Sequence, residues 1–334
     1  MVMVVCMVFI GGVTRLTESG LSIVEWKMVS GILPPMSDSA WEAEFAEYKT
    51  SPEFIKKNTH FGVEEFKNIY WLEWLHRLLG RITGLVFLLP LIIFAVQKKL
   101  PKPLFWRMFA ISALVGTQGT VGWIMVASGL EDAPRVNPIK LALHLSIAFT
   151  IFCALLWTFL QLTRLRPSRS HAGVRTGVRV LLGITVVQII LGALVAGLDA
   201  GYSYNTYPLM DGEFIPSQLY LLSPWWKNHL ESILTVQFQH RMGALILVIS
   251  TLALVAYAWR HWFPEERPWL KALLLILGIQ FLLGVSTLLT HMNIWVASAH
   301  QLVALALLAV LTLLMYRTPK RKIPTNMAVA ATEA

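Results

Sequence analysis

Glu73-Trp-Leu-His-Arg-Leu-Leu-Gly-Arg-Ile-Thr-Gly-Leu-Val-Phe-Leu-Leu-Pro-Leu-Ile-Ile-Phe-Ala-Val96 places a histidine near the start of a long apolar segment. Roughly 20 apolar residues in a helix are enough to cross the hydrocarbon core of a bilayer. An ionisable residue in such a segment is costly and usually marks a functional site. Besides His76, three further apolar segments carry a histidine near the same end, at His144, His240 and His300. The pattern therefore predicts a membrane protein organised around four histidines.

Composition supports this fold class, because 56% of the 334 residues are hydrophobic and only 14% are charged. The sequence predicts seven full spans, at 75–96, 104–128, 139–162, 177–197, 234–259, 269–290 and 294–316. The run from Val2 to Val13 is too short, since at ~1.5 Å per residue it covers less than the roughly 30 Å core. We expect it to be the end of a first helix whose beginning is missing. The predicted fold is thus an all-α polytopic membrane protein with eight transmembrane helices.

The basic residues indicate the orientation in the membrane. The net charge is +9, and Lys and Arg cluster in every second loop, at 98–107, 164–179, 260–271 and 317–322. By the positive-inside rule these clusters and both termini are cytoplasmic, and residues 323–334 are expected to form a disordered tail. All four histidines then lie towards the extracytoplasmic side. The charge reflects this asymmetry, so we predict no nucleic-acid partner.

An internal repeat divides the chain into two related halves. In each half the same features follow in the same order: a loop motif, His-Arg, Gln-x-x-x-Gly and a second histidine. The matching elements are 17–22 with 198–203, His76-Arg77 with His240-Arg241, Gln118/Gly122 with Gln280/Gly284, and His144 with His300. Parallel repeats of this kind place sites within or between bundles. We therefore predict two pseudo-symmetric four-helix bundles in tandem, residues 1–165 and 166–322.

The histidines form one pair in each predicted bundle. Two histidines at equal depth on different helices can bind one haem iron from opposite faces. A zinc or copper site would need further ligands, and no Cys, Asp or Glu set with suitable spacing accompanies them. The residue one turn deeper than each histidine is small, which leaves room for a porphyrin or serves helix packing: Gly80, Ala148, Ala244 and Ala304.

Arg77 and Arg241 follow the first histidine of each half, on the side opposite to the basic loops. Arginine binds carboxylates with two parallel hydrogen bonds, so both residues are candidates for binding haem propionates. The alternative is ordinary snorkelling of the side chain to the interface. Arg15, Arg81 and Arg135 are weaker candidates.

One position distinguishes the two halves. Glu73 lies three residues before His76, whereas the equivalent position before His240 is Gln237. A carboxylate beside only one site suggests that the first half moves protons or stabilises developing positive charge, while the second transfers electrons. The alternative is a solvated glutamate at the interface.

The first extracytoplasmic segment, residues 14–70, is long and is expected to contain a surface helix. Ser39 and Glu42 have capping-box spacing, and Trp41, Phe45 and Tyr48 form one apolar stripe. Such a stripe usually packs on its own protein or lies at the lipid interface.

The motifs of this chain resemble those of the haem A synthases. The resemblance covers nearly the whole sequence and is closest to the mitochondrial and proteobacterial branch, since the cysteine pair of the Gram-positive branch is missing from the first outer loop. The matching stretches are Gly11–Ser22, Glu73–Arg81, Gly197–Gly201, Gln237–Arg241 and Ala299–Gln301.

The resemblance implies an oxidoreductase of the bacterial inner membrane that oxidises the C8 methyl of haem O to a formyl group, giving haem A for cytochrome oxidase. It implies that His240 and His300 ligate a resident haem b. It further implies that His76 and His144 bracket the substrate haem O, with Glu73 as the acidic residue nearby. The implied partners are the farnesyltransferase that makes haem O and an electron donor that the sequence does not identify. The oligomeric state is also open, with a homo-oligomer among the alternatives.

Two other functions fit the four histidines. A dihaem cytochrome b would only pass electrons, and a haem transporter or chaperone would need ligands but no acidic catalyst. Neither gives a role to Glu73.

Overall fold

The computed structural model describes residues 1–27, 30–131, 134–163, 172–262 and 264–318. Within these residues the regular structure is helical, apart from one isolated bridge between Met210 and Glu213. Seven described helices are long and apolar enough to cross a membrane. They are α4 (Val63–Val96), α5 (Lys102–Ala127), α6 (Pro138–Leu162), α7 (Ala172–Gly197), α9 (Ile233–His261), α10 (Arg267–Leu289) and α11 (Ile294–Arg317). The predicted all-α, multi-pass membrane fold is confirmed.

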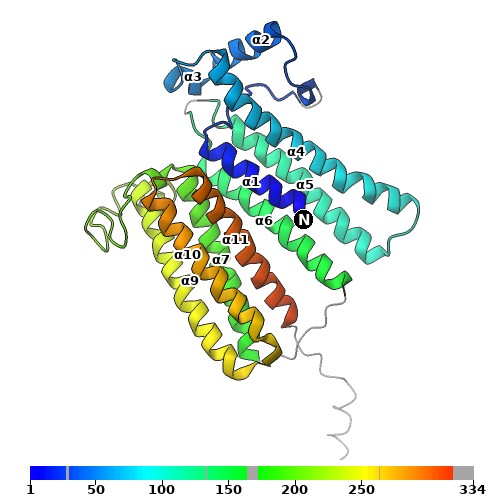
Figure 1. The fold of residues 1–334 in the computed structure, drawn as a ribbon, viewed down its shortest axis with the longest axis vertical. Coiled ribbons are helices and arrows are strands. Elements are labelled where there is room, and N and C mark those ends of the chain that lie inside the picture. The colour runs from blue at the N-terminus through cyan, green and yellow to red at the C-terminus, as the bar shows by residue number, and fades with distance from the viewer. Residues whose placement is uncertain (28–29, 132–133, 164–171, 263, 319–334) are drawn as a thin grey trace, which may run out of the picture.

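A shorter apolar helix, α1 (Val2–Leu16), precedes these seven. Its 15 residues extend about 22 Å at 1.5 Å per residue, which is less than a bilayer core. Figure 1 shows it beside α4, α6 and α11, with its first residue part-way along those helices.

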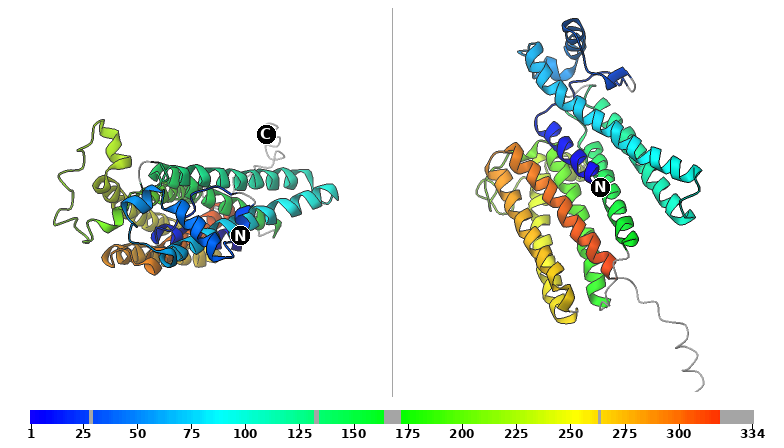
Figure 2. Two further views of the ribbon diagram at one scale, coloured as in Figure 1. Left: turned by 90° about the horizontal axis from the view of Figure 1, so that it is seen from above. Right: turned by 45° about the vertical axis from the view of Figure 1, so that its right-hand side comes forward.

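The eight helices form two rings of four. In the first half, α1 contacts α4, α4 contacts α5, α5 contacts α6, and α6 closes the ring against α1. In the second half, α7, α9, α10 and α11 close in the same order. The two bundles stand side by side and are joined through α6, α7, α1 and α11, as Figures 1 and 2 show. The predicted boundary between residues 165 and 166 and the predicted tail at 323–334 lie outside the described residues.

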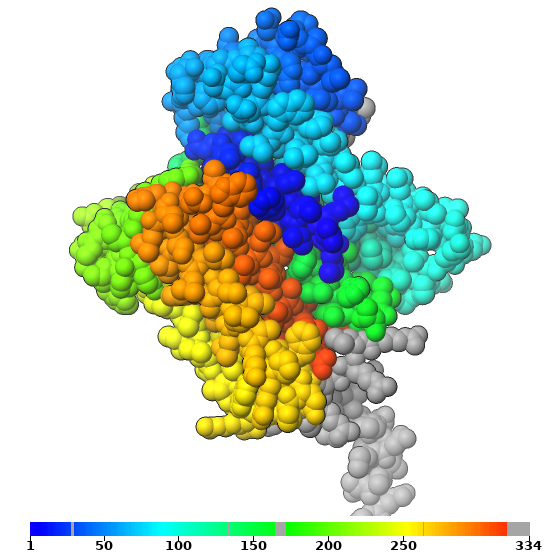
Figure 3. Space-filling view, in the orientation of Figure 1, coloured from blue at the N-terminus to red at the C-terminus, as the bar shows by residue number. Residues whose placement is uncertain are grey.

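Apolar packing joins the two halves along α1. A core cluster combines Val4 and Val8 of α1 with Phe149 of α6 and with Leu305 and Leu308 of α11. In the space-filling view of Figure 3, α1 lies between the second-half helices α10 and α11 and the first-half helix α4. The first helix therefore belongs to one bundle and also forms part of the contact with the other.

The first outer segment is more helical than expected. It contains η1 (Ser30–Ile32), α2 (Asp38–Tyr48) and α3 (Pro52–Lys56), and α4 begins at Val63, twelve residues before the predicted span. The outer turns of α4 are polar but support α2, whose Trp41, Phe45 and Tyr48 pack on Phe66 and Tyr70. The apolar stripe thus packs on its own protein.

The predicted cap of α2 was wrong by two residues. Ser37, with extended backbone, is the N-cap, and its hydroxyl accepts a hydrogen bond from the N–H of Ala40. The helix therefore begins before Ser39, since the side chain that satisfies the free N–H groups of the first turn belongs to Ser37.

The second outer segment contains η2 (Ala200–Tyr202), η3 (Trp225–Lys227) and the single turn α8 (Asn228–Glu231). The short η4 (Pro264–Glu266) connects α9 to α10 at the other end of the bundle. Figure 1 shows α2, α3 and the second outer segment at one end, and the α4–α5 and α9–α10 connections at the opposite end.

Candidate functional site

Matching asparagine caps set the depth of two histidines. Asn137 and Asn293 begin α6 and α11, and each side-chain oxygen accepts hydrogen bonds from two backbone N–H groups of the first turn. His144 and His300 both follow seven residues after their cap, on the second turn of the helix. The equal spacing places the two imidazoles at the same distance from the outer end.

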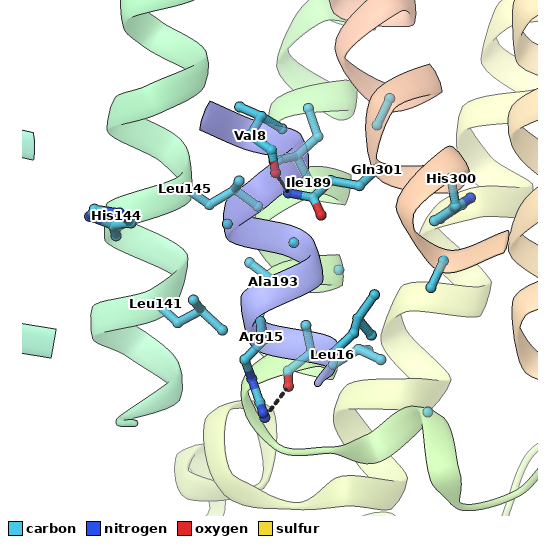
Figure 4. Close-up of a pocket in the computed structure, with 18 of the residues that line it drawn as sticks. Val8, Arg15, Leu16, Leu141, His144, Leu145, Ile189, Ala193, His300 and Gln301 are labelled. Carbon is cyan, nitrogen blue, oxygen red and sulfur yellow. Dashed lines mark hydrogen bonds between the residues drawn. The ribbon is translucent and has the colours of Figure 1, made fainter. Parts of the chain in front are cut away.

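The fold pairs the histidines within each half, as the repeat suggested. His76 on α4 and His144 on α6 belong to one ring of helices, and His240 on α9 and His300 on α11 belong to the other. All four line one cavity of about 680 Å³. Figure 4 shows His144 and His300 on opposite sides of α1, each directed away from α1 and into its own half.

Each histidine ring packs against a glycine on a neighbouring helix. A Cβ atom on Gly122, Gly192 or Gly284 would lie 2.8, 2.9 and 2.9 Å from the ring of His144, His240 and His300, respectively. A Cβ on Gly11 would lie 3.4 Å from His76, so this contact is less tight. Glycine is needed at positions 122, 192 and 284 because any side chain there would displace the neighbouring imidazole.

Three of the histidines also contact a glutamine located one helical turn before that glycine. The amide nitrogen of Gln118 lies 3.1 Å from Nε2 of His144, and that of Gln188 lies 3.0 Å from Nδ1 of His240. Nδ1 of His300 donates to the backbone carbonyl of Gln280 at 3.1 Å. These contacts fix the orientation of each imidazole ring.

The cavity residues fit haem in both halves. The small residues predicted to leave room for a porphyrin all line the cavity: Gly80, Ala148, Ala244 and Ala304. Nδ1 of His144 is buried and has no hydrogen-bond partner within the described part of the chain. Paired imidazoles, small neighbours and a largely apolar wall are what a flat, iron-bearing ligand requires.

Glu73 is buried beside the first pair and lines the same cavity. Its Oε2 atom accepts hydrogen bonds from the Ser22 hydroxyl at 2.7 Å and from the Ile23 N–H at 2.9 Å. Its Oε1 atom accepts two from the Arg77 guanidinium, at 3.0 and 2.7 Å. The carboxylate is therefore not solvated, and its orientation is fixed from both sides.

Gln237 makes the corresponding contacts in the second half with a neutral amide. Its nitrogen donates to the carbonyls of Ala200 and Ser203 at 2.8 and 2.7 Å, and its oxygen accepts from Arg241 at 3.2 Å. Both loop motifs turn through an acidic residue in the left-handed region, with φ 52° at Glu18 and 55° at Asp199. Both halves thus join this position to a loop and to the following arginine, but the loop groups differ and the charge is present in the first half alone at this position.

The two candidate propionate arginines bind the outer loops. Arg77 donates to the carbonyls of Ile23 and Glu25, and Arg241 donates to those of Tyr204 and Thr206. Neither guanidinium is simply exposed to solvent, as snorkelling would require. The propionate role stays a prediction. The weaker candidates Arg15, Arg81 and Arg135 also line the cavity.

Comparison with known proteins identifies the relatives of this chain. Residues 1–312 match the family described as cytochrome oxidase assembly protein. The chain belongs to this family. The proteins named Heme A synthase from Bradyrhizobium diazoefficiens and Agrobacterium fabrum are 44% and 46% identical to it. These alignments cover 95% and 91% of this chain and 88% and 84% of the relatives. A third, from Parvibaculum lavamentivorans, is 42% identical over 95% of this chain and 92% of its own length.

In this family member, the repeat motifs identified most of the site, but Gln188 was missed. The signal was present, because Gln188 and Gly192 have the same Gln-x-x-x-Gly spacing as Gln118 with Gly122. The first half has Met7-x-x-x-Gly11 at the corresponding place, so three of the four histidine-facing glycines are preceded by this glutamine.

Proposed function

We propose that this chain is a haem A synthase, an oxidoreductase that converts the C8 methyl of haem O into the formyl group of haem A for cytochrome oxidase. The family match and the relatives named Heme A synthase support this reaction. Two histidine pairs that face one cavity in a multi-pass membrane protein supply places for a haem substrate and a haem cofactor.

In this proposal the two halves have different roles. The substrate haem O is held between His76 and His144, and a resident haem b is ligated by His240 and His300. The observation that carries the assignment is the contrast between Glu73 and Gln237, which occupy equivalent positions in otherwise matching hydrogen-bond networks. At this pair of equivalent positions, the first half has a carboxylate and the second half has a neutral amide.

Bound haem would supply the electron-transfer chemistry, and the protein would supply position and charge. Glu73 is suited to stabilise positive charge that develops at the methyl carbon, because a preoriented anion in a site without water acts strongly. Proton acceptance by Glu73 would first require a hydrogen bond from Arg77 or Ser22 to break. The fixed geometry therefore favours the electrostatic role.

In this proposal Arg77 and Arg241 hold propionates with guanidinium groups that also donate hydrogen bonds to backbone carbonyls of the outer loops. A propionate at Arg77 would compete with Glu73, whereas the Nε atom of Arg241 is buried and makes no hydrogen bond to the described residues. Arg241 is thus the stronger candidate of the two.

We further propose an inner-membrane location with cytoplasmic termini and with the haem sites towards the outer side, because the basic connections lie at the end opposite α2 and α3. Haem O would arrive from the membrane farnesyltransferase that makes it, and electrons from a separate donor.

Extraction of pigments after co-expression with the haem O-forming farnesyltransferase tests the activity. The proposal predicts haem A in the extract, and none when this protein is omitted. Extraction of haem b alone would contradict the enzyme and would favour an electron-carrying cytochrome b.

A further inference from the structure

We infer that His76 is the exchangeable haem ligand among the four histidines, and that Met7 makes it so by standing where the second half has Gln188. The inference rests on the proposed function, since it concerns the haem that His76 and His144 would hold. It adds a specific role for Met7, which contributes no ligand and no charge, and for the interhelical contacts of α1.

Met7 and Gln188 are equivalent by the structure of the repeat as well as by sequence. Glu18 and Asp199, which share a left-handed backbone at the second position of the loop motif, lie 181 positions apart (199 − 18). The carbonyls that accept from Arg77 and Arg241 are related by the same separation, as are Gly11 and Gly192. Applied to Met7, this separation leads to Gln188.

Gln188 holds His240 by two contacts. Its amide nitrogen lies 3.0 Å from Nδ1 of the ring and donates to the backbone carbonyl of the same histidine at 2.9 Å. The ring is also packed tightly against Gly192. These two contacts and the close packing hold the ring in one position and one plane before haem binds.

His144 and His300 are held in a related way from α5 and α10. Gln118 contacts the first ring, and Gln280 contacts the second with both its amide and its backbone carbonyl. Each half therefore has an anchored histidine on its last helix, and the difference in how the histidines are held lies in the one that follows the loop motif.

His76 lacks both restraints. Among the described residues no hydrogen bond reaches its ring, and the Met7 thioether offers only a weak acceptor. A Cβ on Gly11 would lie 3.4 Å from the ring, against 2.8 to 2.9 Å at the other three positions. Met7 lines the cavity on this side, close to Gly80. The ring thus has more room and no partner that sets its orientation.

This asymmetry matches the different demands on the two sites. Mutation of a residue that orients a metal-bound histidine typically weakens metal affinity about 10- to 100-fold. A resident cofactor benefits from keeping that affinity, whereas a substrate must leave again as product. One anchored and one loosely held ligand would position the first-half haem and still release it.

A reciprocal exchange of the two residues tests the inference. Wild type, Met7→Gln and Gln188→Met would be purified from cells that also make haem O, and haem loss to excess apomyoglobin would be followed by absorption. We expect Gln188→Met to release second-half haem about 10- to 100-fold faster. We expect Met7→Gln to release first-half haem at least several-fold more slowly. Cys6→Gln, at an exposed neighbour on α1, is the matched control for placing an amide on this helix.

Unchanged release of first-half haem from Met7→Gln, with normal second-half haem as evidence of folding, would overturn the inference. Failure of the proposed function would give a different result. The wild-type protein and His144→Ala would then hold the same haems. That result would overturn both.

Discussion

Glu73 and Gln237 occupy equivalent positions in the two halves, and each ties an outer loop to the helix that carries a histidine. The Glu73 carboxylate accepts hydrogen bonds from its loop, whereas the Gln237 amide donates hydrogen bonds to its loop. Each side chain also accepts a hydrogen bond from the arginine one helical turn later, Arg77 or Arg241. The same structural task is thus performed with a charge in the first half and without one in the second. The predictions below separate the structural task from the charge.

Replacement of Glu73 by glutamine should remove the charge and keep a side chain of the same shape. An oxygen remains to accept from Ser22 and Ile23, so the loop should stay docked. We expect haem A formation to fall about 100-fold or more, as happens when one preorganised electrostatic group is lost from an active site. Haem A extracted per mole of purified protein is the measurement.

Glu64→Gln is the control, because Glu64 is an exposed carboxylate on the same helix. It should leave haem A formation unchanged. Normal haem A formation by Glu73→Gln would show that the first half is not the reaction site.

The close contact between Gly284 and His300 makes a second prediction. Gly284→Ala would place a Cβ 2.9 Å from the imidazole and should displace the ring, lowering second-half haem content severalfold. Gly278→Ala on the same helix is the matched control, because a Cβ there meets nothing within 4 Å. Equal haem absorption in the two variants would contradict the packing described for His300.

Glu53 in the outer segment should make local stability depend on pH. Burial raises the pKa of this carboxyl to about 7, and nearby Glu73 and Glu18 act in the same direction, while Lys57 and the hydrogen bond from Tyr48 oppose it. Unfolding returns the pKa to its ordinary value near 4.5. The folded segment therefore loses stability as pH rises from about 4.5 through 7, by up to about 3 kcal/mol.

Glu53→Gln should remove this dependence, since the amide can still accept from Tyr48. Amide hydrogen exchange in α2 and α3 should be slower in the variant than in wild type at pH 8, and equal at pH 4.5. A difference of the same size at both pH values would mean that the titration of Glu53 does not control this segment.

The ion pair between Arg15, near the end of α1, and Asp199, in the second loop motif, joins the two halves at 2.6 Å. Both side chains are partly exposed, so the coupling should be modest, about 1 kcal/mol. Arg15→Gln, Asp199→Asn and the double variant form a cycle whose non-additivity in unfolding free energy measures it. Asn is the conservative choice because Asp199 has a left-handed backbone. Strict additivity would contradict a direct interaction between the two side chains.

Hydropathy was sufficient to predict the seven long apolar helices, and the four histidines singled out by the repeat all line one cavity, while their pairing around haem stays a prediction. A histidine at the same depth in four apolar helices is a strong constraint, because each helix has one face available to its bundle. The start of α4 was less predictable, since its outer turns are polar and become helical by supporting the aromatic residues of α2.

The partners of the arginines could not be predicted from sequence. A cation near the outer face suggests an anionic ligand, but Arg77 and Arg241 satisfy most of their donors with backbone carbonyls of the loops. Carbonyl acceptors leave no signature in the side-chain sequence. Met7 could not be singled out for a related reason. An apolar residue in an apolar helix has no evident role until the repeat aligns it with Gln188.

Haem composition of two ligand variants tests the central claim most directly. His144→Ala and His300→Ala change residues at equal depth on equivalent helices, and both proteins would be purified from cells that make haem O. The account predicts that His144→Ala retains haem b and lacks haem O and haem A, whereas His300→Ala loses haem b. Loss of haem b from His144→Ala, with haem O or haem A still bound, would contradict the division of roles between the two halves.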